Sequence, residues 1–294
     1  MPHSIFAENI TSNMGAERVP SDITTLQTPE GTQLSIRNRG CFVTDFSMVD
    51  PTTGERVNIL YNPDDIEIPK LTASHIMSPA GPSDGIGGQH GYARWADYHE
   101  FTQDNDQLTS FQAKRSDMGP GVSKFFELAD EMLATSTTLT NYESTDVETS
   151  IGEHLYFALE DESTDGLLIG GQTIDQKFGE GTEKSIMEGN AFFWAEYSGS
   201  VTVNFPAGRI VMISADTEPK LHTPKLGMLI WHKPGTESVC FEPTLGFVSG
   251  DQNTELTIPP HESVSLITYI DVEIHQSASE KKFVDDWTKR LSTK

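Results

Sequence analysis

"SVSLITYIDVEI", residues 263–274, alternates apolar and polar side chains over its whole length. Successive side chains of a β-strand point to opposite faces of the sheet, so residues two apart share a face. The residues that share one face here are Val264, Leu266, Thr268, Ile270, Val272 and Ile274. This pattern predicts a long antiparallel strand that is buried on one face.

Shorter segments of the same kind precede this strand. β-branched and aromatic residues alternate with polar ones in residues 32–48, on both sides of a turn at residues 38–40, and further strand-like runs follow between residues 107 and 259. Turn signals such as "DPTTGE", "PAGPSDG" and "HKPGTE" separate the runs, and no periodic helix stands between successive strands. The sequence therefore predicts an all-β fold, a large sandwich of antiparallel sheets.

The chain is expected to form one domain over residues 1–294. It contains no repeat of fixed period, no low-complexity tract and no linker long enough to separate two units, and all-β sandwiches reach about 250 residues as single domains. One helix is predicted near the C-terminus, in "SEKKFVDDWTKRL" at residues 279–291, from a serine cap and apolar residues at Phe283, Trp287 and Leu291.

Composition excludes several classes of partner. The chain carries 44 acidic against 20 basic residues, a formal net charge of −24, which repels phosphate backbones and anionic membrane surfaces. No signal-peptide pattern and no apolar run long enough to span a bilayer occur, so a soluble, cytoplasmic protein is expected. The two cysteines, Cys41 and Cys240, lie in apolar segments without a C-x-x-C arrangement, which predicts buried, reduced thiols.

A glycine-rich stretch, "DGIGGQHGYARWADYHEF" at residues 84–101, invites a ligand site. Its glycines do not fit G-x-G-x-x-G, because position 90 is histidine, and no lysine follows as a phosphate loop requires. A metal site of cupin type would use His90, His99 and Glu100, but this spacing puts no pair on one strand face. The local alternative is a surface loop whose glycines turn corners.

Two titratable residues stand out on predicted strands. In "IGEHLYFALE", alternation sends Leu155 and Phe157 to one face and His154 to the other, and in "SVCFEPTLGF" Glu242 projects away from the face of Phe241. Burying a carboxylate on an otherwise apolar strand is unfavourable unless it has a bonding partner or a functional role. A histidine beside a partly buried glutamate is an acid–base pair, and a structural ion pair is the alternative.

Four motifs in order, "GGQHGYARW", "EHLYFAL", "LIWHKPG" and "CFEP", resemble the aldose 1-epimerase (galactose mutarotase-like) superfamily. "HGYAR" is most similar to its hexose-6-phosphate 1-epimerase-like branch, and the likeness runs from about residue 34 to residue 274. The resemblance implies a β-supersandwich with a shallow, open sugar cleft on the concave face of one sheet. It also implies interconversion of the α and β anomers of a hexose or hexose 6-phosphate without a cofactor or metal.

Roles follow from the resemblance position by position. Glu242 would be the general base that takes the proton of the anomeric hydroxyl, and His154 the general acid that protonates the ring oxygen. His90 would hydrogen-bond the sugar near the ring oxygen, and Arg94 would orient hydroxyls or a phosphate. Family members place an aspartate between the histidine and the glutamate, and Asp175 in "GGQTIDQKFG" is the candidate here.

Two alternatives remain beside a sugar epimerase. One is a carbohydrate-binding protein that has the same cleft without catalysis, and the other is the metal-dependent enzyme that uses His90, His99 and Glu100. Trp95 and Trp231 are candidate platforms for a sugar face, although tryptophans in such segments are more commonly core residues. The expected partner is a small sugar or sugar phosphate, and the sequence does not indicate an oligomeric state.

Overall fold

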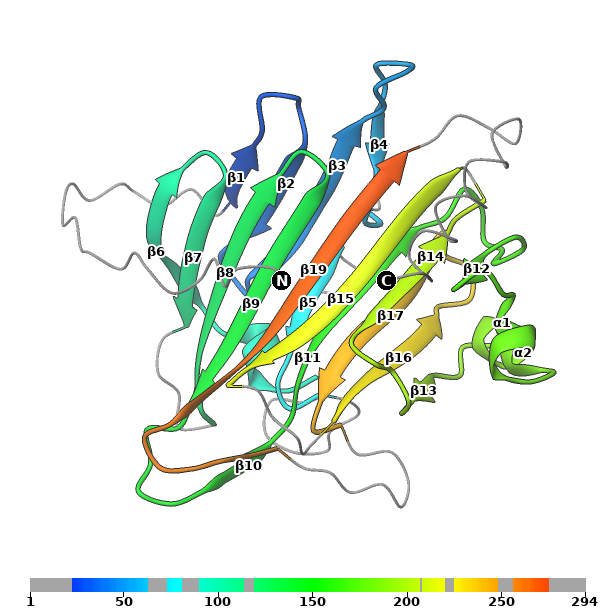
Figure 1. The fold of residues 1–294 in the computed structure, drawn as a ribbon. Coiled ribbons are helices and arrows are strands. Elements are labelled where there is room, and N and C mark those ends of the chain that lie inside the picture. The colour runs from blue at the N-terminus through cyan, green and yellow to red at the C-terminus, as the bar shows by residue number, and fades with distance from the viewer. Residues whose placement is uncertain are drawn as a thin grey trace.

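Two large antiparallel sheets face each other in the computed structural model (Figure 1). The structure describes residues 23–62, 73–80, 90–113, 119–206, 208–219, 225–247 and 256–274. The predicted all-β sandwich is therefore confirmed. The helix expected at residues 279–291 lies outside the described residues, as do the glycines at positions 85, 87 and 88.

The first sheet carries the residues of the candidate site. Its strand order in the described part of the chain is β1-β2-β3-β5-β11-β17-β16-β13, with β4 paired to β3. The strands span Ile23–Gln27 (β1), Gln33–Arg37 (β2), Phe42–Val49 (β3), Arg56–Asn58 (β4), Ser74–Met77 (β5), Ile151–Ala158 (β11), Phe192–Trp194 (β13), Leu226–His232 (β16) and Ser238–Leu245 (β17).

The second sheet covers the first (Figure 1). Its order among the described residues is β12-β14-β15-β19-β9-β8-β7-β6. The strands span Tyr98–Asn105 (β6), Leu108–Ala113 (β7), Gly121–Ala129 (β8), Met132–Thr140 (β9), Leu168–Ile169 (β12), Ser200–Asn204 (β14), Arg209–Glu218 (β15) and Ser263–Ile274 (β19). Val147–Thr149 (β10) and Leu256–Ile258 (β18) form a separate small ribbon.

The strand β19 packs its apolar face between the sheets, as its alternation predicts. Val264, Leu266, Ile270 and Val272 are buried members of a hydrophobic core that draws residues from both sheets. β19 lies between β15 and β9 in its own sheet and contacts β11 and β17 of the other. Both cysteines are buried and free, as expected.

Two short α-helices lie between β12 and β13, where the sequence shows no periodic helix. Ile174–Phe178 (α1) and Thr182–Met187 (α2) are too short to show a helical period in the sequence. The missed signal is the capping box of α1, in which Thr173 and Gln176 bond each other's backbone N–H groups.

A single turn of 3-10 helix, Tyr92–Trp95 (η2), follows β5. Within the described part of the chain, no helix combines the length and apolar character needed to cross a membrane.

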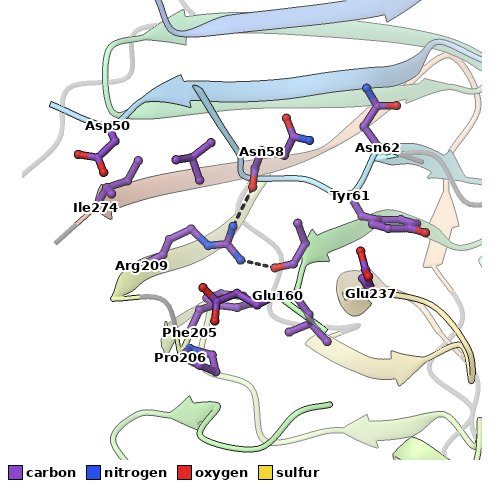
Figure 2. Close-up of a pocket in the computed structure, with 13 residues that line it drawn as sticks. Asp50, Asn58, Tyr61, Asn62, Glu160, Phe205, Pro206, Arg209, Glu237 and Ile274 are labelled. Carbon is purple, nitrogen blue, oxygen red and sulfur yellow. Dashed lines mark hydrogen bonds between the residues drawn. The ribbon is translucent and has the colours of Figure 1, made fainter. Parts of the chain in front are cut away.

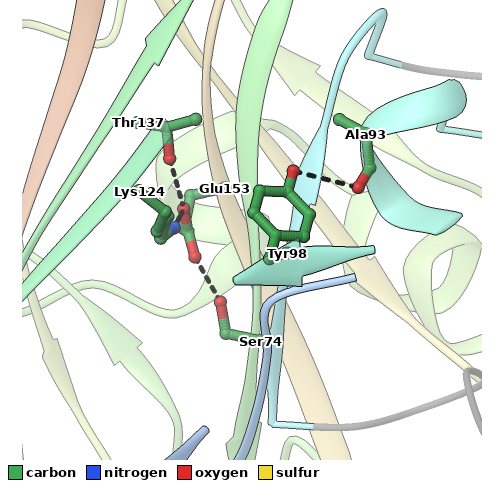
Figure 3. A network of polar contacts seen from close by, with 6 residues as sticks. All are labelled: Ser74, Ala93, Tyr98, Lys124, Thr137 and Glu153. Carbon is green, nitrogen blue, oxygen red and sulfur yellow. Dashed lines mark hydrogen bonds and ion pairs between the residues drawn. The ribbon is translucent and has the colours of Figure 1, made fainter. Parts of the chain in front are cut away.

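A buried ion pair joins the two sheets (Figure 3). Lys124 on β8 pairs with Glu153 on β11, and both side chains are almost fully buried. Glu153 also accepts hydrogen bonds from Ser74 on β5 and from Thr137 on β9, the latter at 3.5 Å. Because these partners saturate the carboxylate, they fix how β5 and β11 lie against the second sheet.

A second polar link between the sheets borders a cavity of about 460 Å³ (Figure 2). Arg209, at the start of β15, donates from Nη1 to the carbonyl of Asn58 at 2.8 Å and from Nη2 to the carbonyl of Ala158. Its guanidinium also lies 4.3 Å from the ring centroid of Phe205. These two carbonyls end β4 and β11, so one side chain of the second sheet ties two strands of the first.

Candidate active site

His154 and Glu242 lie side by side on neighbouring strands of the first sheet. β11 lies between β5 and β17, and the register that pairs Leu155 with Phe241 puts His154 opposite Glu242. His154 Nε2 is 3.2 Å from Glu242 Oε1, and the two side chains are 2% and 5% exposed. Leu155 and Phe241 belong to the core, so the pair occupies the opposite face, as strand alternation predicts.

Burial controls the proton affinity of this pair. Loss of hydration raises the pKa of Glu242 to about 8, although the positive charge of Arg94 acts in the opposite direction. Burial lowers the pKa of His154 well below its usual value, and the charges of His90 and Arg94 add to this effect. Both shifts favour an uncharged pair with the acidic proton on Glu242, so only the carboxyl titrates near neutral pH.

His90 reaches the pair from a tight corner after β5. Its backbone has φ 65°, which is uncommon for a residue with a side chain, and Gly91 follows with φ 75°. A Cβ on Gly91 would lie 1.9 Å from the carbonyl oxygen of Ser78, so only glycine fits. The N–H of Ser78 donates to the carbonyl of His90 at 3.1 Å. This corner holds the His90 ring 5.2 Å from the ring of His154, edge to face.

Arg94 lies buried in η2 and brings positive charge to the site. Its positive charge lowers the pKa values of His90, His154 and Glu242. The ring of Trp95 lies 5.5 Å from the guanidinium carbon and is 38% exposed. The structure therefore brings together four residues that the sequence analysis placed in one site: His90, Arg94, His154 and Glu242.

The sequence analysis missed a third histidine of the cluster. His75 on β5 pairs directly across from His154 in the strand register, and the two rings stack with centroids 4.6 Å apart. Tyr156 stacks on His154 at 4.3 Å. A histidine in the apolar run "SHIM" is a visible signal, but the sequence does not show that this strand pairs with β11.

Aromatic side chains enclose the pair. The ring of Trp231 lies edge-on to His154 at 6.0 Å, and its Nε1 donates to the carbonyl of Gly189 at 2.9 Å. The resemblance implies an open cleft, whereas His154 and Glu242 are buried because His75, Tyr156 and Trp231 pack around them.

Asp175 has a different environment from the four residues that converge. It lies in α1, and its carboxylate accepts the backbone N–H groups of Gly181 at 3.1 Å and Glu183 at 2.8 Å. These bonds lower its pKa and join α1 to α2. Its carboxylate thus has a structural explanation that does not involve a sugar.

The three residues of the cupin alternative do not converge. His90 lies among the other histidines beside the first sheet, whereas His99 and Glu100 are exposed on β6 of the second sheet. Glu100 accepts a hydrogen bond from Thr109 at 2.8 Å. The described residues instead offer two other groups of metal-ligating atoms, His75 with His90 and His154, and His154 with Cys240 and Glu242.

Comparison with solved structures finds the same arrangement of sheets in many proteins. A galactose mutarotase-like protein from Lactobacillus casei superposes with a TM-score of 0.65 at 15% identity, over 85% of this chain and 100% of that one. The chain has the galactose mutarotase-like fold. An aldose epimerase homologue from C. elegans gives 0.65 at 12% identity, over 87% and 99%, and a galactose mutarotase related enzyme from Lactobacillus acidophilus gives 0.65 at 13%, over 87% and 98%.

The mutarotase-like fold is thus shared at sequence identities that carry no information on activity. No protein-family model and no curated protein sequence matches the chain. The likeness therefore establishes the fold, and the function has to be argued from the side chains that this mutarotase-like sandwich brings together.

Proposed function

We propose that the protein is an aldose 1-epimerase that interconverts the α and β anomers of a hexose or hexose 6-phosphate. The observation that carries the proposal is the buried contact of 3.2 Å between His154 Nε2 and Glu242 Oε1. The ring oxygen and the anomeric hydroxyl of a pyranose are bonded to the same carbon. An acid and a base that serve both oxygens must therefore lie close together, as this pair does.

The single proton that the pair holds is sufficient for the reaction. Movement of the carboxyl proton from Glu242 to His154 creates a carboxylate beside an imidazolium. Glu242 then takes the proton of the anomeric hydroxyl while His154 protonates the ring oxygen, the bond from C1 to the ring oxygen breaks, and C1 becomes an aldehyde. The pair returns to its uncharged state at the end of this step. Rotation about C1–C2 and closure by the reverse transfers give the other anomer.

Arg94 and His90 assist this exchange in the proposal. The positive charge of Arg94 lowers the pKa of Glu242, so it stabilises the carboxylate that the reaction needs. Burial lowers the pKa of His90 to about 4, which keeps its imidazole neutral and able to hydrogen-bond a sugar oxygen. The acidic chain offers few cations for a phosphate, and Arg94 is the one that the site supplies among the described residues.

Polarimetry of freshly dissolved α-D-glucose, D-galactose and α-D-glucose 6-phosphate tests the proposal. We expect the protein to accelerate the approach to the equilibrium rotation for at least one sugar. Glu242→Gln and His154→Asn should each reduce kcat at least about 100-fold, within the range that general acid–base groups contribute. The control is Glu237→Gln, which neutralises an exposed carboxylate at the cavity of Figure 2 and should leave the rate unchanged.

A carbohydrate-binding protein without catalysis is the second candidate. The hydrogen bonds from the backbone of Gly181 and Glu183 to Asp175 favour this second candidate. Family members place an aspartate between the catalytic residues, and with Asp175 bonded in this way no such aspartate would contact the sugar. Saturable sugar binding by calorimetry, with rotation that changes no faster than in buffer, would select this candidate over the epimerase.

A further inference from the structure

Three histidines from separate segments meet in the middle of the first sheet. His75 comes from β5, His90 from the corner before η2, and His154 from β11. Each offers a ring nitrogen, and these three atoms all lie within 4.8 Å of one another. The β5–β11 register and the bond between Ser78 and His90 hold the three segments together, so the cluster is built by backbone pairing.

Four of the six ring nitrogens of this cluster are buried without a hydrogen-bond partner. Both ring nitrogens of His75 are buried without a hydrogen bond, as are Nδ1 of His90 and Nδ1 of His154. A buried polar atom without a hydrogen-bond partner is unfavourable, so four such atoms in one place favour the binding of a ligand that can bond to them. The epimerase chemistry uses Nε2 of His154 and assigns no role to His75.

The cluster is also in the right ionisation state for a metal. Burial lowers the pKa of His75 and of His154 well below the usual value and that of His90 to about 4, so all three imidazoles are neutral at physiological pH. A neutral imidazole is the form that coordinates a metal ion. The charge of Arg94 opposes a bound cation.

We propose that His75, His90 and His154 bind a divalent transition-metal ion, with Zn²⁺ as the best fit, and that the bound ion stops catalysis. Imidazole ligands suit zinc, copper and nickel, whereas magnesium and calcium prefer oxygen. Zinc–nitrogen bonds of about 2.0–2.1 Å put tetrahedral ligands about 3.4 Å apart. Small side-chain rotations from the present spread, which is at most 4.8 Å, complete such a site.

Inhibition follows because the ion and the reaction share one imidazole. An ion coordinated by His154 fixes its ring and withdraws the electron density that proton transfer needs, and it occupies space beside Glu242. Metal binding itself is independent of the activity, whereas inhibition rests on the proposed epimerase function. The ion is therefore an inhibitor in this proposal, and the epimerase reaction proceeds without it.

Calorimetry on the full-length chain, stripped with a chelator and titrated with ZnCl₂, tests the binding. We expect one Zn²⁺ per chain and none of this binding with MgCl₂. His75→Phe keeps a ring of similar shape against His154 but removes a ligand, and it should weaken zinc binding at least tenfold. His99→Ala removes an exposed histidine on β6 and should bind as the wild type does. Equal affinities of wild type and His75→Phe would overturn the proposal.

A thermal melt separates loss of binding from loss of folding. Zinc should raise the Tm of the wild type and of His99→Ala but not of His75→Phe, and His75→Gln serves as a second variant if His75→Phe does not give a cooperative melt. In polarimetry, excess ZnCl₂ should abolish the acceleration by the wild type, and a chelator should restore it. The rate of His75→Phe should be the same with and without ZnCl₂. Zinc binding without mutarotation would leave the site intact and refute the epimerase proposal alone.

Discussion

Glu242 sets the pH range in which the acid–base pair holds one proton. Because burial raises its pKa to about 8 and lowers that of His154, the pair carries a single proton from well below pH 6.5 up to about pH 8. Catalysis needs that proton, so kcat/KM should be constant at neutral pH and fall above about pH 8. Initial rates from pH 6 to pH 9.5, corrected for the buffer reaction, check this expectation.

Arg94 provides the control for that profile. Its charge lowers the pKa of Glu242, so Arg94→Met should move the alkaline limb to higher pH as well as reduce the rate. A wild-type rate that still increases between pH 8 and pH 9 would contradict the proposal that the pair must hold one proton. It would mean that the form with an ionised Glu242 and a neutral His154 is the active one.

The same carboxyl predicts a pH dependence of stability. The folded state keeps the proton up to about pH 8, whereas an unfolded glutamate releases it near 4.5. The raised pKa thus stabilises the fold fully below about 4.5, and the contribution is lost as pH rises, by up to about 1.4 kcal/mol per pH unit. Glu242→Gln, which mimics the protonated form, should be more stable than wild type at pH 9 but not at pH 5. Urea titrations at both pH values measure the difference, and parallel losses in the two proteins would contradict it.

Residue by residue, the sequence shows which face a side chain occupies better than it shows which side chains meet. Alternation within one strand is local, so His154 and Glu242 could be assigned to the face opposite Leu155 and Phe241. Their contact depends on the pairing of β11 with β17, and only the resemblance suggested it. His75 was missed because it depends on another such pairing, between β5 and β11.

At the level of elements, the Lys124–Glu153 pair holds β11 against the second sheet. Lys124→Met would leave the Glu153 carboxylate buried with only the hydroxyls of Ser74 and Thr137, and we expect a loss of about 3–5 kcal/mol in the free energy of unfolding. Adding Glu153→Gln removes the buried, unpaired charge and should restore part of the lost free energy of unfolding. Denaturant unfolding of the single and double variants gives both values.

A matched control for this pair is Lys184→Met. Lys184 and Glu188 form an exposed pair at 3.8 Å with side chains 80% and 58% exposed, so its loss should have little effect. If Lys124→Met proved as mild as this control, the pair would not be what fixes β11.

Long strands and helices could be predicted from the sequence more readily than short ones. Long half-buried strands such as β9 and β19 repeat the period of two often enough to be recognised. The strands β4, β12 and β13 have three residues or fewer and show no period, and α1 and α2 complete less than two turns each. Short elements are defined by the neighbours they pair or pack with, which a single sequence does not reveal.

Across the whole molecule, Arg209 ties the second sheet to two strand ends of the first. Lysine cannot donate to the carbonyls of Asn58 and Ala158 in the same planar arrangement, so Arg209→Lys should leave a buried carbonyl unpaired and cost about 1–3 kcal/mol. Thermal melts should show a lower Tm. Arg56→Lys is the control, because Arg56 makes a similar double contact, to Ser47 and Gly31, in a more exposed setting. Equal losses in the two variants would argue against a special role for the Arg209 link.

The whole architecture was predicted from two kinds of information. Strand patterns and turn signals gave an all-β sandwich on physical grounds. The order of four motifs gave the mutarotase-like arrangement of its sheets, which no periodicity could supply. Asp175, which no motif marks, stays a prediction, and its carboxylate links α1 to α2 through the backbone of Gly181 and Glu183.

The candidate catalytic residues lie on β11 and β17 and the proposed zinc ligand His75 lies on β5. These three strands have bonded strands on both sides, whereas β1 and β13 end the sheet. Backbone amides in such a position exchange with deuterium only when much of the molecule opens. In mass-spectrometric exchange, peptides that contain His75, His154 and Glu242 should therefore be labelled last, after those from β1 and β13. The chemistry would then be lost only together with the fold.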